Sequence, residues 1–254
     1  MMLNVDKGRL AVLLLVALMA FVGCSGEETQ GEESLNFDFS GDEEVGEDFE
    51  EFSAAKGKAD GLDFEGSPLE FKTACEEGQE VTIAAVGDLL IHGRLQRQAL
   101  GHDEGFGSLW SGIKDLMAAA DVTYANLEGP TAPGTNKFGR DTTDPGKSFD
   151  DNVYSSYPMF NYHPSLLTDL IDSGVDVVST ANNHSLDRRS LGADRTIEEL
   201  ERVGMPYTGT RRKGDDQAPW HTVTNGGGCN LAWLARTYGP TGTPDPHKQV
   251  PRCF

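Results

Sequence analysis

Two amides, an imidazole and a carboxylate stand close together in the stretch S-T-A-N-N-H-S-L-D, residues 179–187. An apolar run precedes this stretch, and the pattern of an amphipathic helix follows it. A turn from a strand into a helix requires only a glycine or a capping residue. Amide oxygens, imidazoles and carboxylates are the groups that bind metals and transfer protons. The stretch therefore indicates a site rather than a simple connection.

Polar groups also end two earlier apolar runs. Asp88 follows the first run, and Asn126 and Glu128 end the second. In open α/β sheets, ligands bind at the carboxyl ends of the strands. If the three strands are neighbours, four side chains should converge there: Asp88, Glu128, Asn183 and His184. This set of oxygen and nitrogen ligands suits manganese, zinc or iron.

Each of these residues also has an ordinary structural explanation. An Asp after a strand often caps a helix or occupies a turn, and an Asn pair tolerates left-handed backbone. A single histidine is more often a hydrogen-bonded structural residue than a ligand. Three polar strand ends in one chain nevertheless favour a shared site.

The elements that would position these groups alternate between strands and helices. The expected strands are 81–86, 121–128, 175–181 and 229–236, and the first has the continuous apolar character of a strand covered on both faces. The expected helices are 106–120, 164–174 and 191–204, the last two ending at Gly174 and Gly204. The apolar face of the first helix would comprise Phe106, Leu109, Trp110, Ile113, Leu116 and Met117. This alternation predicts an α/β domain with partly parallel pairing.

Most of the net charge of −20 falls in one segment, because 19 acidic and 3 basic residues lie between Ser25 and Glu80. Such a segment buries too little apolar surface to offset its ordering entropy, so 25–78 is predicted to be a disordered acidic linker. Its phenylalanines are either sparse apolar residues in that linker or docking groups, and we favour the first. No basic patch with interleaved aromatics is present, which argues against a nucleic-acid partner.

Two basic residues precede an apolar run at 10–24, which is short for a transmembrane helix. The run ends in F-V-G-C and resembles a bacterial lipobox, although Phe21 stands where Leu is usual. We therefore predict that 1–24 is a lipoprotein-type signal peptide with Cys24 lipidated. The protein would then be exported and membrane-anchored in the cell envelope. An ordinary cleaved signal or a single-span anchor is the alternative.

Three further cysteines are Cys75, Cys229 and Cys253. An exported chain can oxidise one pair of them, and three pairings remain open. No Cys-x-x-Cys is present, which argues against a zinc site made of thiolates.

Three motifs, V-G-D-L-L, Y-A-N-L-E-G-P and S-T-A-N-N-H-S-L-D, together resemble the CapA family over roughly residues 81–240. These proteins are linked to bacterial poly-γ-glutamate capsule synthesis. The family is similar to the calcineurin-like metallophosphatases, so the resemblance implies an αββα sandwich with a two-metal site. It implies that 79–254 is a CapA-like α/β domain of which only the first half is present.

The resemblance also implies residue roles. Asp88, Glu128 and Asn183 would hold divalent metal ions, and His184 would be the imidazole beside the scissile group. Asn126 and Asp187 would support them, Asp187 by orienting His184 or by capping the next helix. The implied partner is an anionic polymer such as poly-γ-glutamate.

The sequence departs from the family pattern in two ways. Arg189 stands where a glycine is usual, and an arginine in a left-handed conformation would strain that turn. Family members also continue beyond this point with further histidines, for which His247 is no substitute. The chain is therefore expected to be a fragment or a frameshift product that binds metal weakly. Three hypotheses stay open: a metal-dependent hydrolase, a non-catalytic capsule-assembly or polymer-binding subunit, and a fragment that folds poorly.

Overall fold

The computed structural model describes residues 2–3 and 80–253, which form a five-stranded sheet with the order β1-β2-β3-β4-β5 and a separate hairpin. In the sheet, β1 (Met2–Leu3) pairs antiparallel with β2 (Ile83–Asp88). The other strands are parallel: β2, β3 (Val122–Asn126), β4 (Val177–Ser179) and β5 (Tyr207–Thr208). This parallel sheet with its helices confirms the predicted α/β class. The predicted linker 25–78 lies outside the described residues.

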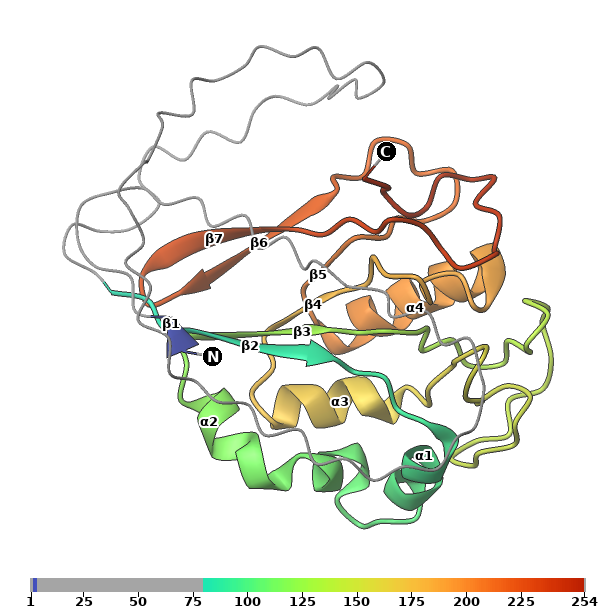
Figure 1. Cartoon of the computed structure of the whole chain (residues 1–254), viewed down its shortest axis with the longest axis horizontal. Coiled ribbons are helices and arrows are strands. Elements are labelled where there is room, and N and C mark those ends of the chain that lie inside the picture. Colours follow the sequence, from blue (N-terminus) through green and yellow to red (C-terminus); the bar gives the residue numbers. More distant parts are fainter. Residues whose placement is uncertain (1, 4–79, 254) are drawn as a thin grey trace, which may run out of the picture. The chain divides into compact units, whose positions relative to one another are not determined.

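The hairpin consists of β6 (His221–Gly226) and β7 (Cys229–Leu234), paired antiparallel. It lies over one face of the large sheet (Figure 1), where the ring of Trp233 stacks on that of Tyr124 from β3 at 5.6 Å. The opposite face carries α1 (Gly93–Leu100), α2 (Lys114–Ala118) and α3 (Ser165–Asp172). A helix layer, a parallel sheet and a second small sheet are consistent with the predicted metallophosphatase-like α/β fold.

The helix ends were read correctly from glycines. The helix α3 ends just before Gly174, and α4 (Arg189–Val203) ends at Gly204. Both glycines have positive φ, 89° and 72°, which glycine adopts without a steric cost. The buried residues of α3, Leu166, Leu167 and Leu170, join the main hydrophobic core under the sheet.

The prediction of a single helix at 106–120 was wrong. The segment forms two short 3₁₀ helices, Gly105–Leu109 and Ser111–Ile113, followed by α2. Two of the expected core residues are exposed, Ile113 by 44% and Leu116 by 57%. Side chains of α3 hold the broken backbone, because Asp169 accepts the Phe106 N–H at 2.7 Å.

The prediction that the first strand is covered on both faces was also wrong. In β2, Ala85 and Gly87 are exposed. The hairpin contacts the neighbouring strand β3 through Trp233. Three strands, β1, β5 and β6, were not predicted: β1 and β5 have two residues each, and β6 is rich in polar residues.

Within the described residues, no helix is long and apolar enough to cross a membrane. Cys229 is disulfide-bonded and Cys253 is an exposed free thiol, so of the three pairings those with Cys253 are excluded.

Candidate functional site

The carboxyl ends of β2, β3 and β4 lie side by side. Asp88 pairs in register with Asn126, and Asn126 with Ser179. The pairing continues past the strands, because Leu89 N–H donates to the Asn126 carbonyl at 2.8 Å and Leu127 N–H donates to the Ser179 carbonyl at 2.9 Å. Parallel pairing therefore brings the polar groups that follow these strands to one edge of the sheet.

Asn126 connects all three strand ends. Its Nδ2 donates to Asp88 Oδ1 at 2.8 Å. Its Oδ1 accepts from Ser179 Oγ at 2.8 Å and from Asn182 Nδ2 at 3.2 Å. The Asn126 side chain thus fixes the position of the Asp88 carboxylate relative to the turn after β4.

Glu128 is 4% exposed, and its Oε2 has no hydrogen-bond partner among the described residues. Burial, above all, and the nearby Asp88 carboxylate together raise the pKa of Glu128 to about 7, although the charge of His184 opposes the shift. A buried carboxylate beside a second one is destabilised unless a cation or a proton neutralises the pair. Asp88 and Glu128 therefore form a pair that either a proton or a cation would neutralise.

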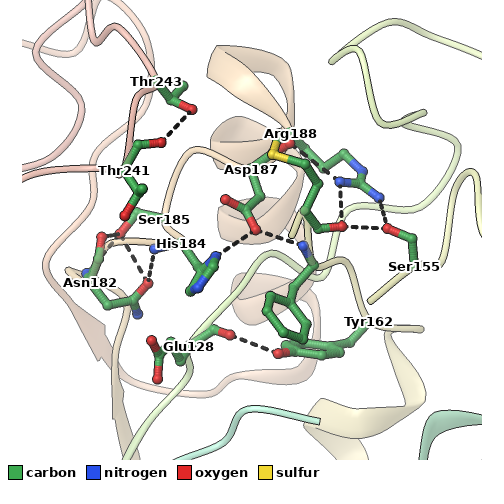
Figure 2. A network of polar contacts seen from close by, with 12 residues as sticks. Glu128, Ser155, Tyr162, Asn182, His184, Ser185, Asp187, Arg188, Thr241 and Thr243 are labelled. Atoms are coloured by element: carbon green, nitrogen blue, oxygen red, sulfur yellow. Dashed lines mark hydrogen bonds and ion pairs between the residues drawn. The ribbon is translucent and has the colours of Figure 1, made fainter. Parts of the chain in front are cut away.

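His184 lies on the same edge and is bound by Asp187 (Figure 2). Asp187 Oδ2 is 2.8 Å from His184 Nδ1. Burial lowers the pKa of His184, but the hydrogen bond and the charge of Asp187, together with the charge of Glu128, outweigh it and raise the pKa overall. An acceptor at Nδ1 favours a proton there in the neutral ring and leaves Nε2 for a substrate or a metal.

The turn that carries His184 is held by its own side chains and by a later loop. Asn182 Oδ1 accepts the His184 N–H at 3.0 Å, and Ser185 Oγ donates to the Thr180 carbonyl at 2.6 Å. Thr241 N–H donates to the Asn183 carbonyl at 3.0 Å. Asn182, which was given no role from the sequence, is thus the amide that joins the network, while Asn183 as a metal ligand stays a prediction.

Three aromatic residues of the site were not found from the sequence. The Phe160 ring contacts those of His184 and His92 edge to face, with centroids 4.8 and 5.3 Å apart. The Tyr162 hydroxyl donates to the Glu128 carbonyl at 2.7 Å. The loop sequence M-F-N-Y gives no signal for such roles. His92 could have been noticed, because it follows Asp88 by four residues.

The donor set fits part of a divalent metal site. Carboxylate and amide oxygens are suitable ligands, and Glu128 Oε2 is a buried oxygen without a hydrogen-bond partner among the described residues. Within residues 2–3 and 80–253, however, no three His, Cys, Asp or Glu side chains are grouped to hold a metal. Asp88 and Glu128 would need further ligands to complete the coordination.

Comparison with known proteins agrees with this architecture. The profile of PGA_cap, described as bacterial capsule synthesis protein, matches residues 82–254. Two curated proteins of Sinorhizobium fredii, the uncharacterized proteins y4sH and y4uA, are each 30% identical over 135 residues, which cover 50% of this chain and 24% of theirs. The chain therefore spans about a quarter of the length of these relatives. Because the matched region extends over most of the chain, including the three polar strand ends, the chain belongs to the bacterial capsule synthesis protein family PGA_cap.

Proposed function

We propose that the whole protein acts in the synthesis or processing of a capsule polymer of the poly-γ-glutamate type by metal-dependent hydrolysis. The observation that carries this proposal is the buried Glu128 carboxyl, which lacks a partner for Oε2, lies beside Asp88 and has a pKa raised to about 7. Two carboxylates at one edge of a parallel sheet are the nucleus of a cation site.

Asp88, Glu128 and Asn183 would hold the ion, with manganese, zinc or iron as candidates. When bound, a divalent ion supplies a hydroxide at neutral pH and polarises the oxygen of the scissile amide or phosphoester. His184 would present Nε2 to the leaving group and protonate it. Asp187 would keep that ring in place through its bond to Nδ1.

A second candidate is a non-catalytic subunit that binds an anionic capsule polymer. The small ligand set favours it, because among the described residues no third His, Cys, Asp or Glu joins the Asp88–Glu128 pair. Such a subunit would use a bound cation to bridge protein and polymer carboxylates rather than to activate water. No nucleic acid is expected as a partner of either.

The proposal includes export and a lipid anchor at Cys24. The basic residues and the apolar run at 10–24 support it, and that segment lies outside the described residues. Cleavage before Cys24 would remove β1 (Met2–Leu3), so the sheet of the mature protein would begin with β2. A lipid anchor would place the site in the cell envelope, where a capsule polymer is made.

Titration of the purified chain with Mn²⁺, followed by electron paramagnetic resonance, tests the cation site. We expect weak binding that is lost in Asp88→Asn and in Glu128→Gln. The control is Asp115→Asn, which removes an exposed carboxylate of α2 and should change nothing. Equal binding by all four proteins would refute the site.

Release of free amines from poly-γ-glutamate separates the two candidates. The full-length protein should release them with Mn²⁺ present, and the His184→Ala variant should not. Binding of the polymer without any release would select the binding subunit.

A further inference from the structure

Arg188 is fully buried, and the partners of its guanidinium are oxygens of the backbone and of one hydroxyl. Nη1 donates to the carbonyls of Met159 at 3.2 Å and Asp187 at 3.3 Å. Nη2 donates to Ser155 Oγ at 2.6 Å and to the Val153 carbonyl at 3.0 Å. One buried side chain therefore donates hydrogen bonds to several residues of the same loop, among them Ser155 (Figure 2).

This arrangement is costly for the fold. Burying a charge without an opposite charge in contact is unfavourable, and Arg188 Nε has no partner among the described residues. Burial lowers the pKa of Arg188 to about 10, against the charges of Asp187, Asp150 and Asp151, so the group is still a cation at neutral pH.

The helix α4 is also shaped around Arg188. A Cβ at Gly192 would lie 2.0 Å from Arg188 Cβ, so only glycine fits there. Glycine inside a helix costs about 1 kcal/mol relative to alanine. The Arg188 guanidinium is buried without an ion-pair partner among the described residues, and Gly192 beside it is unfavourable in a helix. Since both lower the stability of the fold, we infer that the position of Arg188 serves a purpose other than stability.

The bonds of Arg188 meet those of Asp187 at one peptide group. The Met159 carbonyl accepts from Arg188 Nη1, and the Phe160 N–H of the same peptide unit donates to Asp187 Oδ2 at 2.6 Å. The consecutive residues Asp187 and Arg188 thus form hydrogen bonds with the N–H and the C=O of the Met159–Phe160 peptide. The same Asp187 Oδ2 binds His184 Nδ1, and the Phe160 ring lies against the His184 ring.

We propose that Arg188 is a positioning residue, which holds the Met159–Phe160 peptide against Asp187 and thereby fixes the ring of His184. Asp187 Oδ2 receives two donors only while that peptide is in place. Without it, the carboxylate is free to rotate, and His184 loses both its hydrogen-bond partner and the ring that confines it. The catalytic consequence rests on the proposed function, whereas the positioning itself does not.

Nuclear magnetic resonance of the full chain at alkaline pH tests this directly. In the wild type, the ring nitrogens of His184 should show one tautomer with the proton on Nδ1, and the Phe160 ring should show contacts to the His184 ring. In Arg188→Met, we expect averaged tautomers, loss of those contacts and about tenfold faster hydrogen exchange of the Phe160 amide. Arg188→Lys should restore part of each signal, because an ammonium can reach the Met159 carbonyl.

Arg195→Met is the matched control. Arg195 lies on the same helix and also binds loop carbonyls, those of Pro133 and Gly134, but not the Met159–Phe160 peptide. Its loss should leave the His184 signals unchanged. If Arg188→Met also left them unchanged, the positioning role would be refuted.

Ser155→Ala covers the case in which Arg188→Met does not fold. It keeps the charge of Arg188 but removes one of its acceptors, together with the hydrogen bond that Ser155 Oγ donates to the Met159 carbonyl, so it should shift the same signals in the same direction. Unchanged His184 signals in this variant would also refute the role. Because no metal or polymer is needed, an ordered His184 in a chain that binds no Mn²⁺ would overturn the proposed function and leave this inference standing.

Discussion

At the residue scale, the candidate site depends on side chains that act through their neighbours. Asn126 holds Asp88, Asp187 holds His184, and the carbonyl of Glu128 is held by Tyr162. Among the buried carboxylate oxygens of the described residues, Glu128 Oε2 is the one without a hydrogen-bond partner. The groups expected to react are thus fixed by hydrogen bonds, which is the arrangement that precise chemistry requires.

Arg189 has a φ of 57°, the left-handed conformation in which the family pattern has glycine. This conformation costs an L-residue about 1 kcal/mol, so Arg189→Gly should raise the free energy of unfolding by about 0.5–1 kcal/mol. The gain is limited because the stem of Arg189 packs on Gly139, where a Cβ would lie 2.4 Å from Arg189 Cγ. Urea midpoints measure the change. Arg189→Ala keeps the strain and should bring no gain, and a lower midpoint for the glycine variant would contradict the argument.

Tyr162→Phe should destabilise the protein by about 1–3 kcal/mol, because the hydroxyl binds two buried backbone groups. It donates to the Glu128 carbonyl and accepts the Ile91 N–H at 3.3 Å. Chemical denaturation at pH 7 measures the loss. Tyr207→Phe removes a hydroxyl whose contact with Glu201 is an exposed one of 3.4 Å, and it should change stability by less than about 0.5 kcal/mol. If the two substitutions lowered the free energy of unfolding equally, the hydrogen bonds of Tyr162 would not stabilise the protein more than the exposed contact of Tyr207 does.

At the element scale, contacts from other elements decided which apolar segments became helices. The pattern at 106–120 favours one helix, but Asp169 binds the Phe106 N–H and Ser173 Oγ accepts the Trp110 Nε1–H at 2.7 Å. Both acceptors belong to α3 or follow it. Three glycines, at 105, 107 and 112, also weaken a continuous helix. By contrast, α3 and α4 were predictable because their patterns and end signals agree.

The start of α3 should be sensitive to pH. His163 Nδ1 accepts the Ser165 N–H at 3.1 Å, which requires an unprotonated nitrogen. Burial lowers the pKa of His163, the Asp144 and Glu199 charges oppose the shift, and Lys147 adds to it. A depressed pKa means that the stability is fully present above the unfolded value of about 6.5 and is lost as the pH falls through the folded value.

His163→Asn tests this, because Asn keeps an acceptor and does not titrate. Between pH 7.5 and 5, the wild type should lose more unfolding free energy than the variant. His102→Asn, at an exposed histidine, should behave as the wild type. The same loss in His163→Asn and in the wild type would rule out His163 as the cause.

At the scale of the whole molecule, the prediction concerns where in the cell the protein is located. We predict that the mature protein fractionates with membranes, since several acyl chains anchor a protein stably. Cys24→Ser should release it to the soluble fraction or leave its signal uncleaved. A variant that is processed and membrane-bound like the wild type would exclude the lipid anchor.

The sequence by itself determined the class of the fold and the place of the candidate site. Asp88, Glu128 and His184 follow apolar strands directly, and parallel pairing requires the carboxyl ends of such strands to meet. Local backbone conformation could also be predicted from the sequence. This applies to the glycines that end α3 and α4 and to the left-handed position of Arg189. These features depend on neighbours within a few residues or on the general rules of sheets.

Only the tertiary structure decided how the site is held. Phe160, Tyr162 and Arg188 contact the candidate site from a loop and a helix start, and nothing in their spacing predicts it. The same holds for the orphaned oxygen of Glu128, whose raised pKa comes from burial and from Asp88, 40 residues away in sequence. Burial and long-range hydrogen bonds depend on contacts between segments that are distant in the sequence. The local pattern of residues does not predict such contacts.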